Sequence, residues 1–277
     1  MLRFAAPLVL VATLGAEPLA AQTADDAQID ALFVAVGMPD IIEIMREEGV
    51  SYGERLAEDM LPNGPTPQWR DAVNAIYDPQ MMVEEVRGAM GEALEGADVD
   101  AMLAFFTSDL GETIVGLEVS ARRALLDEAV EEASVDASTL QILDETPRYL
   151  MVKEFVETND LIESNVVGAL NSSYAFYLGL IDGGAMPAGI TPEAALQEVW
   201  AQESEIREST TEWVYSFLLL AYQPLSDDEM MAYIAFSESE AGQDLTSAMF
   251  LSFNGMFDDI SRALGIASAR FMATQEL

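Results

Sequence analysis

The chain has 277 residues, 51% of them hydrophobic, and its 49 acidic and 12 basic residues give a formal net charge of −37. It contains no histidine and no cysteine, which excludes Ser-His-Asp and Cys-His nucleophiles, zinc sites with imidazole or thiolate ligands, and disulfides. We also expect no nucleic-acid partner, because phosphates must be neutralised by cationic side chains and this chain has few of them.

The first 21 residues have the pattern of a secretory signal peptide. Arg3 supplies a positive start, residues 4–16 form a mostly apolar run, and Leu19-Ala20-Ala21 is a small-residue cleavage site. The run is shorter than the roughly 20 apolar residues that a membrane span requires. We therefore expect a periplasmic or secreted protein with no integral membrane segment after cleavage. Cleavage would remove one arginine and one glutamate, so the charge would stay at −37.

From residue 26 onward, apolar residues recur at spacings of three and four, which indicates helices, and the alternation typical of strands is absent. The hydrophobic content is sufficient to build a core. We predict an all-α fold. In chain order, the expected helices cover residues 26–36, 39–60, 66–76, 79–94, 98–106, 108–132, a segment from 136, 147–181, 191–222, 226–236 and 239–271.

Local signals mark several helix starts. Ser226-Asp227-Asp228-Glu229 fits the S-x-x-E capping box, in which the serine hydroxyl and the glutamate carboxylate satisfy free N–H groups of the first turn. Thr66 and Asp78 each precede a proline, which is favoured at the first helical position. The capping box at Ser226 is the best local signal in the chain.

Other residues predict loops and interruptions. Residues 62–67 contain three prolines and predict a loop, and the glycine-rich residues 182–189 predict a linker. We expect Gly49 and Gly53 to bend or interrupt the helix over 39–60, because glycine weakens a helix interior. Asn159 is the expected break in the helix over 147–181.

The sequence carries an internal repeat. An offset of 131 positions predicts a duplicated helical bundle with halves at 22–146 and 147–277. Trp69 falls on Trp200 at the same offset. The identical pairs are Ala101 with Ala232, Ala104 with Ala235, Phe105 with Phe236, Ser108 with Ser239, Gly111 with Gly242 and Asp127 with Asp258.

The repeated motif reads aromatic-x-x-Ser-acid-x-Gly and predicts a helix–turn–helix corner. Ser108 and Ser239 would cap the second helix of each corner, and the glycine would permit close backbone approach. An alternative role for these serines is as nucleophiles or ligand contacts. Without a histidine to activate them, capping is favoured.

At this corner the sequence resembles an exported bacterial family known as domain of unknown function 2059, whose motif has the form F-Y-x-S-P-L-G. The copies at 225–255 and 98–127 are similar to it, except that Asp109 and Glu240 replace the proline. An acid in the first turn of a helix is also favourable, so the corner should form. The resemblance implies an all-helical exported fold without a known activity.

Clustered carboxylates are the only acid–base candidates. Adjacent acids on a helix provide neither a cleft nor a raised pKa, so we expect solvated helix faces rather than catalytic groups. Asp98-Val99-Asp100 begins like a calcium loop but lacks its further acids and central glycine. We therefore expect no metal, cofactor or catalytic residue. The clusters are Glu84-Glu85, Asp127-Glu128 with Glu131-Glu132, and Asp227-Asp228-Glu229.

The few arginines stand at helical spacing from acids, which predicts surface ion pairs. Alternatively, the doublet Arg122-Arg123 could bind an anionic ligand. The expected pairs are Glu118 with Arg122, Arg123 with Asp127, Glu203 with Arg207, and Asp258 with Arg262.

Aromatic residues gather on two predicted long helices, and the chain contains 15 methionines. These side chains either fill a helical core or line a groove for an apolar peptide or lipid; a core is favoured. The aromatic residues are Tyr174, Phe176, Tyr177, Trp213, Tyr215 and Phe217.

The leading functional hypothesis is a non-enzymatic periplasmic binding or scaffolding protein with an apolar or basic partner, because catalytic groups are lacking and the negative field attracts cations. The alternative is a carboxylate-dependent hydrolase of a cell-envelope polymer, which requires a buried acidic pair in a cleft. Association with a membrane surface is disfavoured, since such helices are rich in lysine and arginine. The sequence does not set the oligomeric state.

Overall fold

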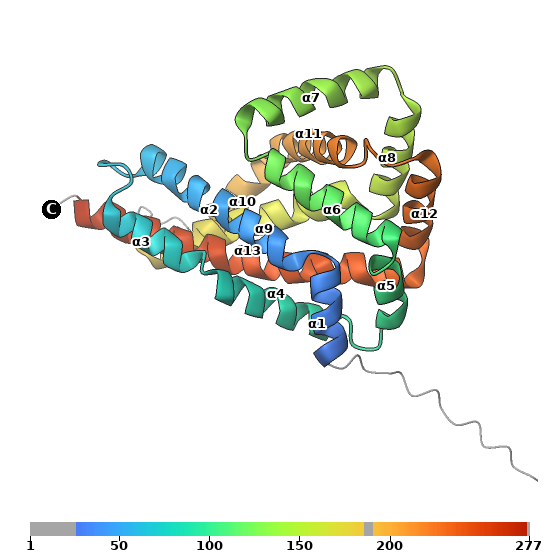
Figure 1. Cartoon of the computed structure of the whole chain (residues 1–277). Coiled ribbons are helices and arrows are strands. Elements are labelled where there is room, and N and C mark those ends of the chain that lie inside the picture. Colours follow the sequence, from blue (N-terminus) through green and yellow to red (C-terminus); the bar gives the residue numbers. More distant parts are fainter. Residues whose placement is uncertain (1–25, 186–190, 276–277) are drawn as a thin grey trace, which may run out of the picture.

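The computed structural model describes residues 26–185 and 191–275. These residues form helices and no strand, which confirms the all-α prediction (Figure 1). The predicted signal peptide, residues 1–21, and residues 186–189 of the predicted linker lie outside the described residues. None of the described helices combines the length and the apolar character that crossing a membrane requires.

The helices follow one another with short connections. Most bounds agree with the expected ranges, and Gly37, with φ 73°, separates the first two helices as expected. The elements are α1 (Asp26–Ala35), α2 (Met38–Met60), α3 (Pro67–Ile76), α4 (Pro79–Ala93), α5 (Val99–Phe106), α6 (Asp109–Ala124), α7 (Glu128–Leu143), α8 (Pro147–Thr158), α9 (Leu161–Asp182), α10 (Pro192–Ala201), α11 (Glu203–Ala221), α12 (Asp227–Glu238) and α13 (Glu240–Gln275).

Side-chain caps set the expected helix starts. The Thr66 hydroxyl accepts a hydrogen bond from the N–H of Trp69 at 3.2 Å, and Asp78 accepts two at the start of α4. The capping box of α12 is complete, because the Glu229 carboxylate also accepts from the backbone N–H of Ser226 at 2.7 Å. All three predicted starts are confirmed.

Two predicted helices are wrong in their interiors, and in a third the structure shows no interruption. The helix expected over 108–132 ends at Ala124, because Asp127 accepts from the N–H of Ala129 and starts α7 there. The helix expected over 191–222 breaks at Gln202, which lets α10 pack Val199 against α9 before α11 turns into the bundle. Conversely, α2 runs without a break through its two glycines. The expected break at Asn159 is present, between α8 and α9.

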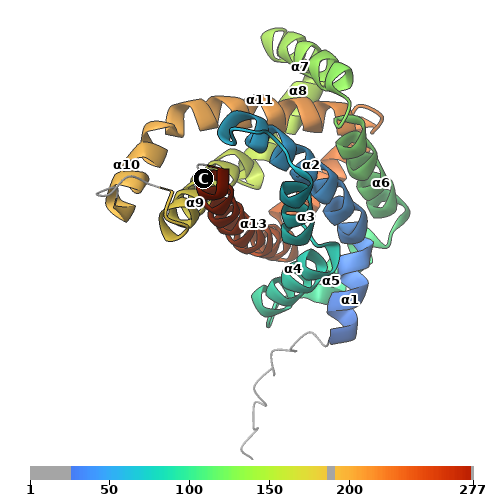
Figure 2. The same cartoon turned by 90° about the vertical axis from the view of Figure 1, so that its left-hand side faces the viewer.

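The core is organised around α13, which runs through most of the length of the molecule (Figures 1 and 2). One continuous hydrophobic cluster contains residues from both 22–146 and 147–277, and a small second cluster joins α9 to α10. In contrast, α7 lies at the outer edge in both views and buries only two serines among its described residues.

Helix α13 packs most extensively against α9, and glycines make that packing close. The position of a Cβ at Gly265 is 3.0 Å from the Cα of Gly179 and overlaps the carbonyl oxygen of Phe176. The two backbones therefore touch directly, which side chains at these positions would prevent.

The two motif corners have the same local geometry. Ser108 Oγ donates to the carbonyl of Phe105 at 2.6 Å and accepts from an N–H at 3.1 Å, and Ser239 repeats both bonds with Phe236 at the same distances. The rings of Phe105 and Phe236 stack on each other at 4.1 Å. Both serines are thus helix caps, as predicted.

We expect Ser226→Ala to lower the free energy of unfolding by about 1 kcal/mol, because it removes the hydroxyl of the capping box. Chemical denaturation followed by circular dichroism measures this change. Ser120→Ala, at an exposed position inside α6, is the matched control and should not destabilise the fold. Equal loss in both variants would contradict the capping role.

Candidate functional site

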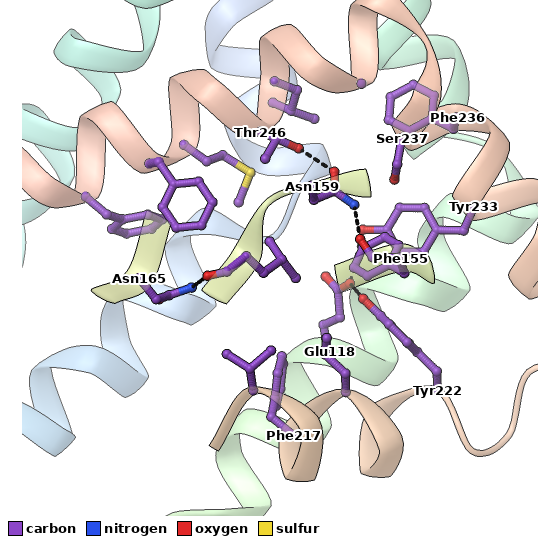
Figure 3. A pocket seen from close by; sticks show the side chains of 18 of the residues that line it. Glu118, Phe155, Asn159, Asn165, Phe217, Tyr222, Tyr233, Phe236, Ser237 and Thr246 are labelled. Carbon is purple, nitrogen blue, oxygen red and sulfur yellow. Dashed lines mark hydrogen bonds between the residues drawn. The ribbon is translucent and has the colours of Figure 1, made fainter. Parts of the chain in front are cut away.

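The bundle contains a mostly apolar cavity of about 250 Å³ that is partly open to solvent (Figure 3). Its lining comes from α5, α6, α8, α9, α11, α12 and α13, so segments far apart in the sequence meet there. Aromatic rings form much of the wall, and they include those of Phe106, Phe155, Trp213, Phe217, Phe236 and Phe253.

Glu118 of α6 is the one acidic residue among those that line this cavity. Its Oε1 atom accepts hydrogen bonds from the hydroxyls of Tyr222 at 2.5 Å and Tyr233 at 3.2 Å (Figure 3). Its Oε2 atom accepts no hydrogen bond from the part of the chain that the structure describes. One carboxyl oxygen is therefore held by the protein, and the other is open to the cavity.

The environment of Glu118 disfavours its charged form. The carboxyl group lies deep in the bundle, and burial raises its pKa, although the two tyrosine hydroxyls oppose this effect. The residue nevertheless keeps partial exposure, since it lines the cavity. Burial and the nearby carboxylate also raise the pKa of Tyr222 and of Tyr233 well above the usual value, so both hydroxyls remain donors.

A second polar group in the cavity wall is satisfied within the protein. Asn159 donates from Nδ2 to the carbonyl of Phe155 at 2.9 Å, and its Oδ1 accepts from Thr246 at 3.0 Å. Asn165 donates to the carbonyl of Leu161 at 2.7 Å. Glu118 is consequently the group in this lining that can bind a charged ligand.

Trp213 separates the cavity from an outer hollow that it also lines. Inside, its ring stacks on Phe217 at 5.3 Å; outside, the Arg122 guanidinium lies 4.8 Å from the ring centroid. Glu48 of α2 holds Arg122 through two hydrogen bonds, of 2.8 and 2.6 Å. This packing shows that the Trp213 face accepts a cation.

The structure corrects most of the expected ion pairs. Arg122 pairs with Glu48 instead of Glu118, whose carboxyl group turns inward to the tyrosines. Asp258 accepts from Ser172 rather than from an arginine. The observed pairs are Arg123 with Glu43 and Glu47 at 3.9 and 3.8 Å, Arg262 with Asp182 at 2.6 Å and, as expected, Arg207 with Glu203 at 2.6 Å.

The predicted carboxylate clusters lie outside the cavity. Asp98 and Asp127 cap helices, and Asp100 accepts from Gln28 at 2.7 Å, so these acids have local structural roles. No group of three or more acidic residues in the described ranges is arranged to hold a metal ion. Asp227 pairs with Arg148, Glu229 belongs to the capping box, and Glu84, Glu128 and Glu132 are exposed.

The predicted aromatic cluster does not form one groove. Trp213 and Phe217 line the cavity, whereas Phe176 and Tyr177 line a separate cleft. Tyr215 packs against a ring of α8, and Tyr174 packs against the small cluster between α9 and α10.

Sequence reasoning missed Glu118 as a site residue. The signal was obscured by Arg122 one turn away, which predicts an ion pair on the surface. The tyrosines that bind Glu118 are 104 and 115 positions distant, beyond the reach of any local pattern.

Comparisons with known proteins add no assignment, since no protein-family model, no curated protein and no solved structure matches the chain. The site itself offers a carboxyl group in an aromatic cavity. Such a group can serve as the counter-ion of a cation or as a proton donor.

Proposed function

We propose that the protein is an exported, non-enzymatic binding protein whose cavity accepts a small apolar molecule with a cationic amine. The observation that carries this proposal is Glu118, a single carboxyl group with one oxygen unoccupied by protein donors, in a wall of aromatic rings. Export rests on the predicted signal peptide.

A cationic head fits the charge of the site. A buried carboxylate without a counter-ion is unfavourable, and an amine beside Glu118 would offset that cost. The net charge of −37 would raise the local concentration of cations around the protein. Trp213 already accepts one cation, that of Arg122, on its outer face.

The size of the cavity limits the apolar part. An engineered apolar cavity of about 150 Å³ binds benzene. The volume of about 250 Å³ therefore suits one or two rings with a short amine arm, but not a long peptide. The ligand we propose is an arylalkylamine or a compact alkylamine.

Calorimetric titration tests this proposal with phenethylamine and with phenethyl alcohol, which has the same ring but no charge. We expect the amine to bind at least about tenfold more tightly than the alcohol, because it makes a charge-assisted bond. Glu118→Gln should abolish that preference. Glu112→Gln removes an exposed carboxylate from the same helix and should leave it unchanged.

Equal affinity for the amine and the alcohol would contradict the proposal. So would a preference that persists in Glu118→Gln. Trp213 fluorescence provides a second readout, with Trp213→Phe to identify its contribution against the two other tryptophans.

The hydrolase alternative stays a prediction. A raised pKa suits a general acid, and Glu118 has one. A glycosidase mechanism would also require a second carboxyl group near Glu118. The other residues that line the cavity in the described ranges are not acidic. A partner would have to come from elsewhere, so the binding role is better supported.

We further infer that the bundle arose by duplication of a helix–turn–helix unit. The matching hydrogen bonds at Ser108 and Ser239 and the stack of Phe105 on Phe236 support this inference. Trp69 and Trp200 differ, because the first is fully buried and the second is 67% exposed. On the basis of the same motif, we propose that the chain is related to the family known as domain of unknown function 2059.

A further inference from the structure

The chain contains two Asn-Gly dipeptides, and the fold places them in different backbone conformations. Asn63-Gly64 lies in the loop between α2 and α3 (Figure 1), whereas Asn254-Gly255 lies inside α13. In such a dipeptide the side-chain amide of asparagine is open to attack by the glycine nitrogen, because glycine has no Cβ to hinder the approach. Both sites therefore carry the same reactive groups, and their surroundings decide which one reacts.

The loop leaves room for this reaction at Asn63. The residue is exposed, and a Cβ placed on Gly64 would meet no atom within 4 Å. The N–H of Gly64 donates to the carbonyl of Leu61 at 3.0 Å, so this bond must open before the nitrogen can attack. Opening an exposed turn outside a helix costs little free energy compared with opening a packed helix.

The helix protects the second dipeptide. Gly255 is exposed and also has open space at its Cβ position, so crowding does not distinguish the two glycines. However, the helical backbone fixes the dihedral angles of Asn254 and binds the N–H groups within α13. The side chain of Asn254 also packs on α9, where a Cβ at Gly168 would lie 2.5 Å from its Oδ1 atom. Attack at Asn254 would require local opening of α13 at its packing against α9, which is costly.

We propose that Asn63 is a site of spontaneous deamidation in the folded protein and that Asn254 is not. The backbone nitrogen of Gly64 loses its proton and forms a bond to Cγ of Asn63. The bond between Cγ and Nδ2 then breaks, ammonia leaves, and a five-membered succinimide ring remains. Water opens this ring at either carbonyl group. The products are aspartate and isoaspartate, in which the main chain runs through Cγ; no atom is oxidised or reduced.

The reaction changes the loop and leaves the packing of its two helices in place. Each conversion adds one negative charge to a chain that already carries −37, and isoaspartate lengthens the main chain of the loop by one carbon atom. Helices α2 and α3 stay joined by the buried Trp69, whose Nε1 donates to the carbonyl of Gly53 at 2.8 Å. Asn63 does not line the amine cavity, so this site is independent of the proposed function.

Incubation of the full chain in mildly alkaline buffer, followed by protease digestion and mass spectrometry, measures the conversion of both asparagines. Alkaline buffer favours the reaction because the attacking nitrogen must lose its proton. In the folded chain we expect Asn63 to react at least about tenfold faster than Asn254, because α13 must first open locally. In urea at a concentration that unfolds the chain, the two rates should become similar, since the dipeptides are identical.

Ion-exchange chromatography of the intact chain gives a second readout, because each conversion adds a negative charge. Asn63→Gln should stop the formation of acidic species, whereas Asn171→Gln, at an exposed position on α9, should form them like the wild type. The proposal is overturned if Asn63 stays intact in the folded chain while the unfolded chain reacts. It is equally overturned if Asn254 reacts as fast as Asn63 in the folded chain, or if urea leaves the ratio of the two rates unchanged.

Discussion

Replacement of Gly265 by alanine is expected to lower the free energy of unfolding by about 3 kcal/mol. The new Cβ would overlap the carbonyl oxygen of Phe176 and approach the Cα of Gly179 to 3.0 Å. These are backbone atoms of α9, so no side-chain rotation relieves the overlap. The two helices would have to separate where their packing is most extensive.

Gly255→Ala on the same helix is the control. A Cβ at Gly255 meets no atom within 4 Å, so the substitution should raise stability by about 0.5–1 kcal/mol through helix propensity. Urea denaturation of both variants, followed by circular dichroism, gives the two free energies. Similar values for both would show that α9 and α13 do not approach each other closely at Gly265.

The helix starts could be predicted because each depends on residues within one turn. The side chain of Thr66 accepts from an N–H three residues on, and Ser226 exchanges bonds with Glu229 at the same spacing. All the residues that form such a cap lie close together in the sequence, so the cap can be recognised without knowledge of the fold. The end of α6 was missed even though Asp127 is a capping residue, because the apolar spacing continues past it.

The glycines show why helix interiors were harder to predict. Gly49 was expected to bend or interrupt α2 on grounds of propensity, yet the helix is not interrupted there, and its backbone packs against the ring of Tyr77. That contact joins residues 28 positions apart, so only tertiary packing explains the glycine. Propensity is a weak guide where packing is close.

The candidate site could not be predicted for the same reason. Glu118 stands one turn from Arg122, and the local rule pairs them, but the fold supplies Glu48 to the arginine and two tyrosines to the acid. The sequence did indicate aromatic surfaces on long helices. It could not show that Trp213 and Phe217 line the cavity whereas Phe176 and Tyr177 line a separate cleft.

Glu118 should make the protein less stable as the pH rises above 4.5, the ordinary pKa of a glutamate. Its pKa is raised in the folded state, so the folded chain holds this proton more tightly than the unfolded chain does. The resulting stability is fully present below pH 4.5 and is lost as the pH rises through the folded pKa. If the pKa of Glu118 in the folded chain lies one unit above that in the unfolded chain, the free energy of unfolding changes by about 1.4 kcal/mol over this pH range.

Chemical denaturation of the wild type and of Glu118→Gln at a series of pH values isolates this effect from the other carboxylates. The stability of the wild type relative to the variant should fall with rising pH and then level off. Glu112→Gln, which also removes one exposed carboxylate from α6, is the control for the loss of a negative charge as such. A flat or rising difference for Glu118→Gln would show that its pKa is not raised.

The same proton connects stability to binding. A cationic ligand stabilises the charged form of Glu118, so its affinity should increase as the pH rises through the pKa of Glu118, while the stability of the unliganded protein falls. Phenethylamine titrations in buffers of different ionisation enthalpy should detect proton release on binding at acidic pH. Binding without proton release there would mean that the amine is not paired with Glu118.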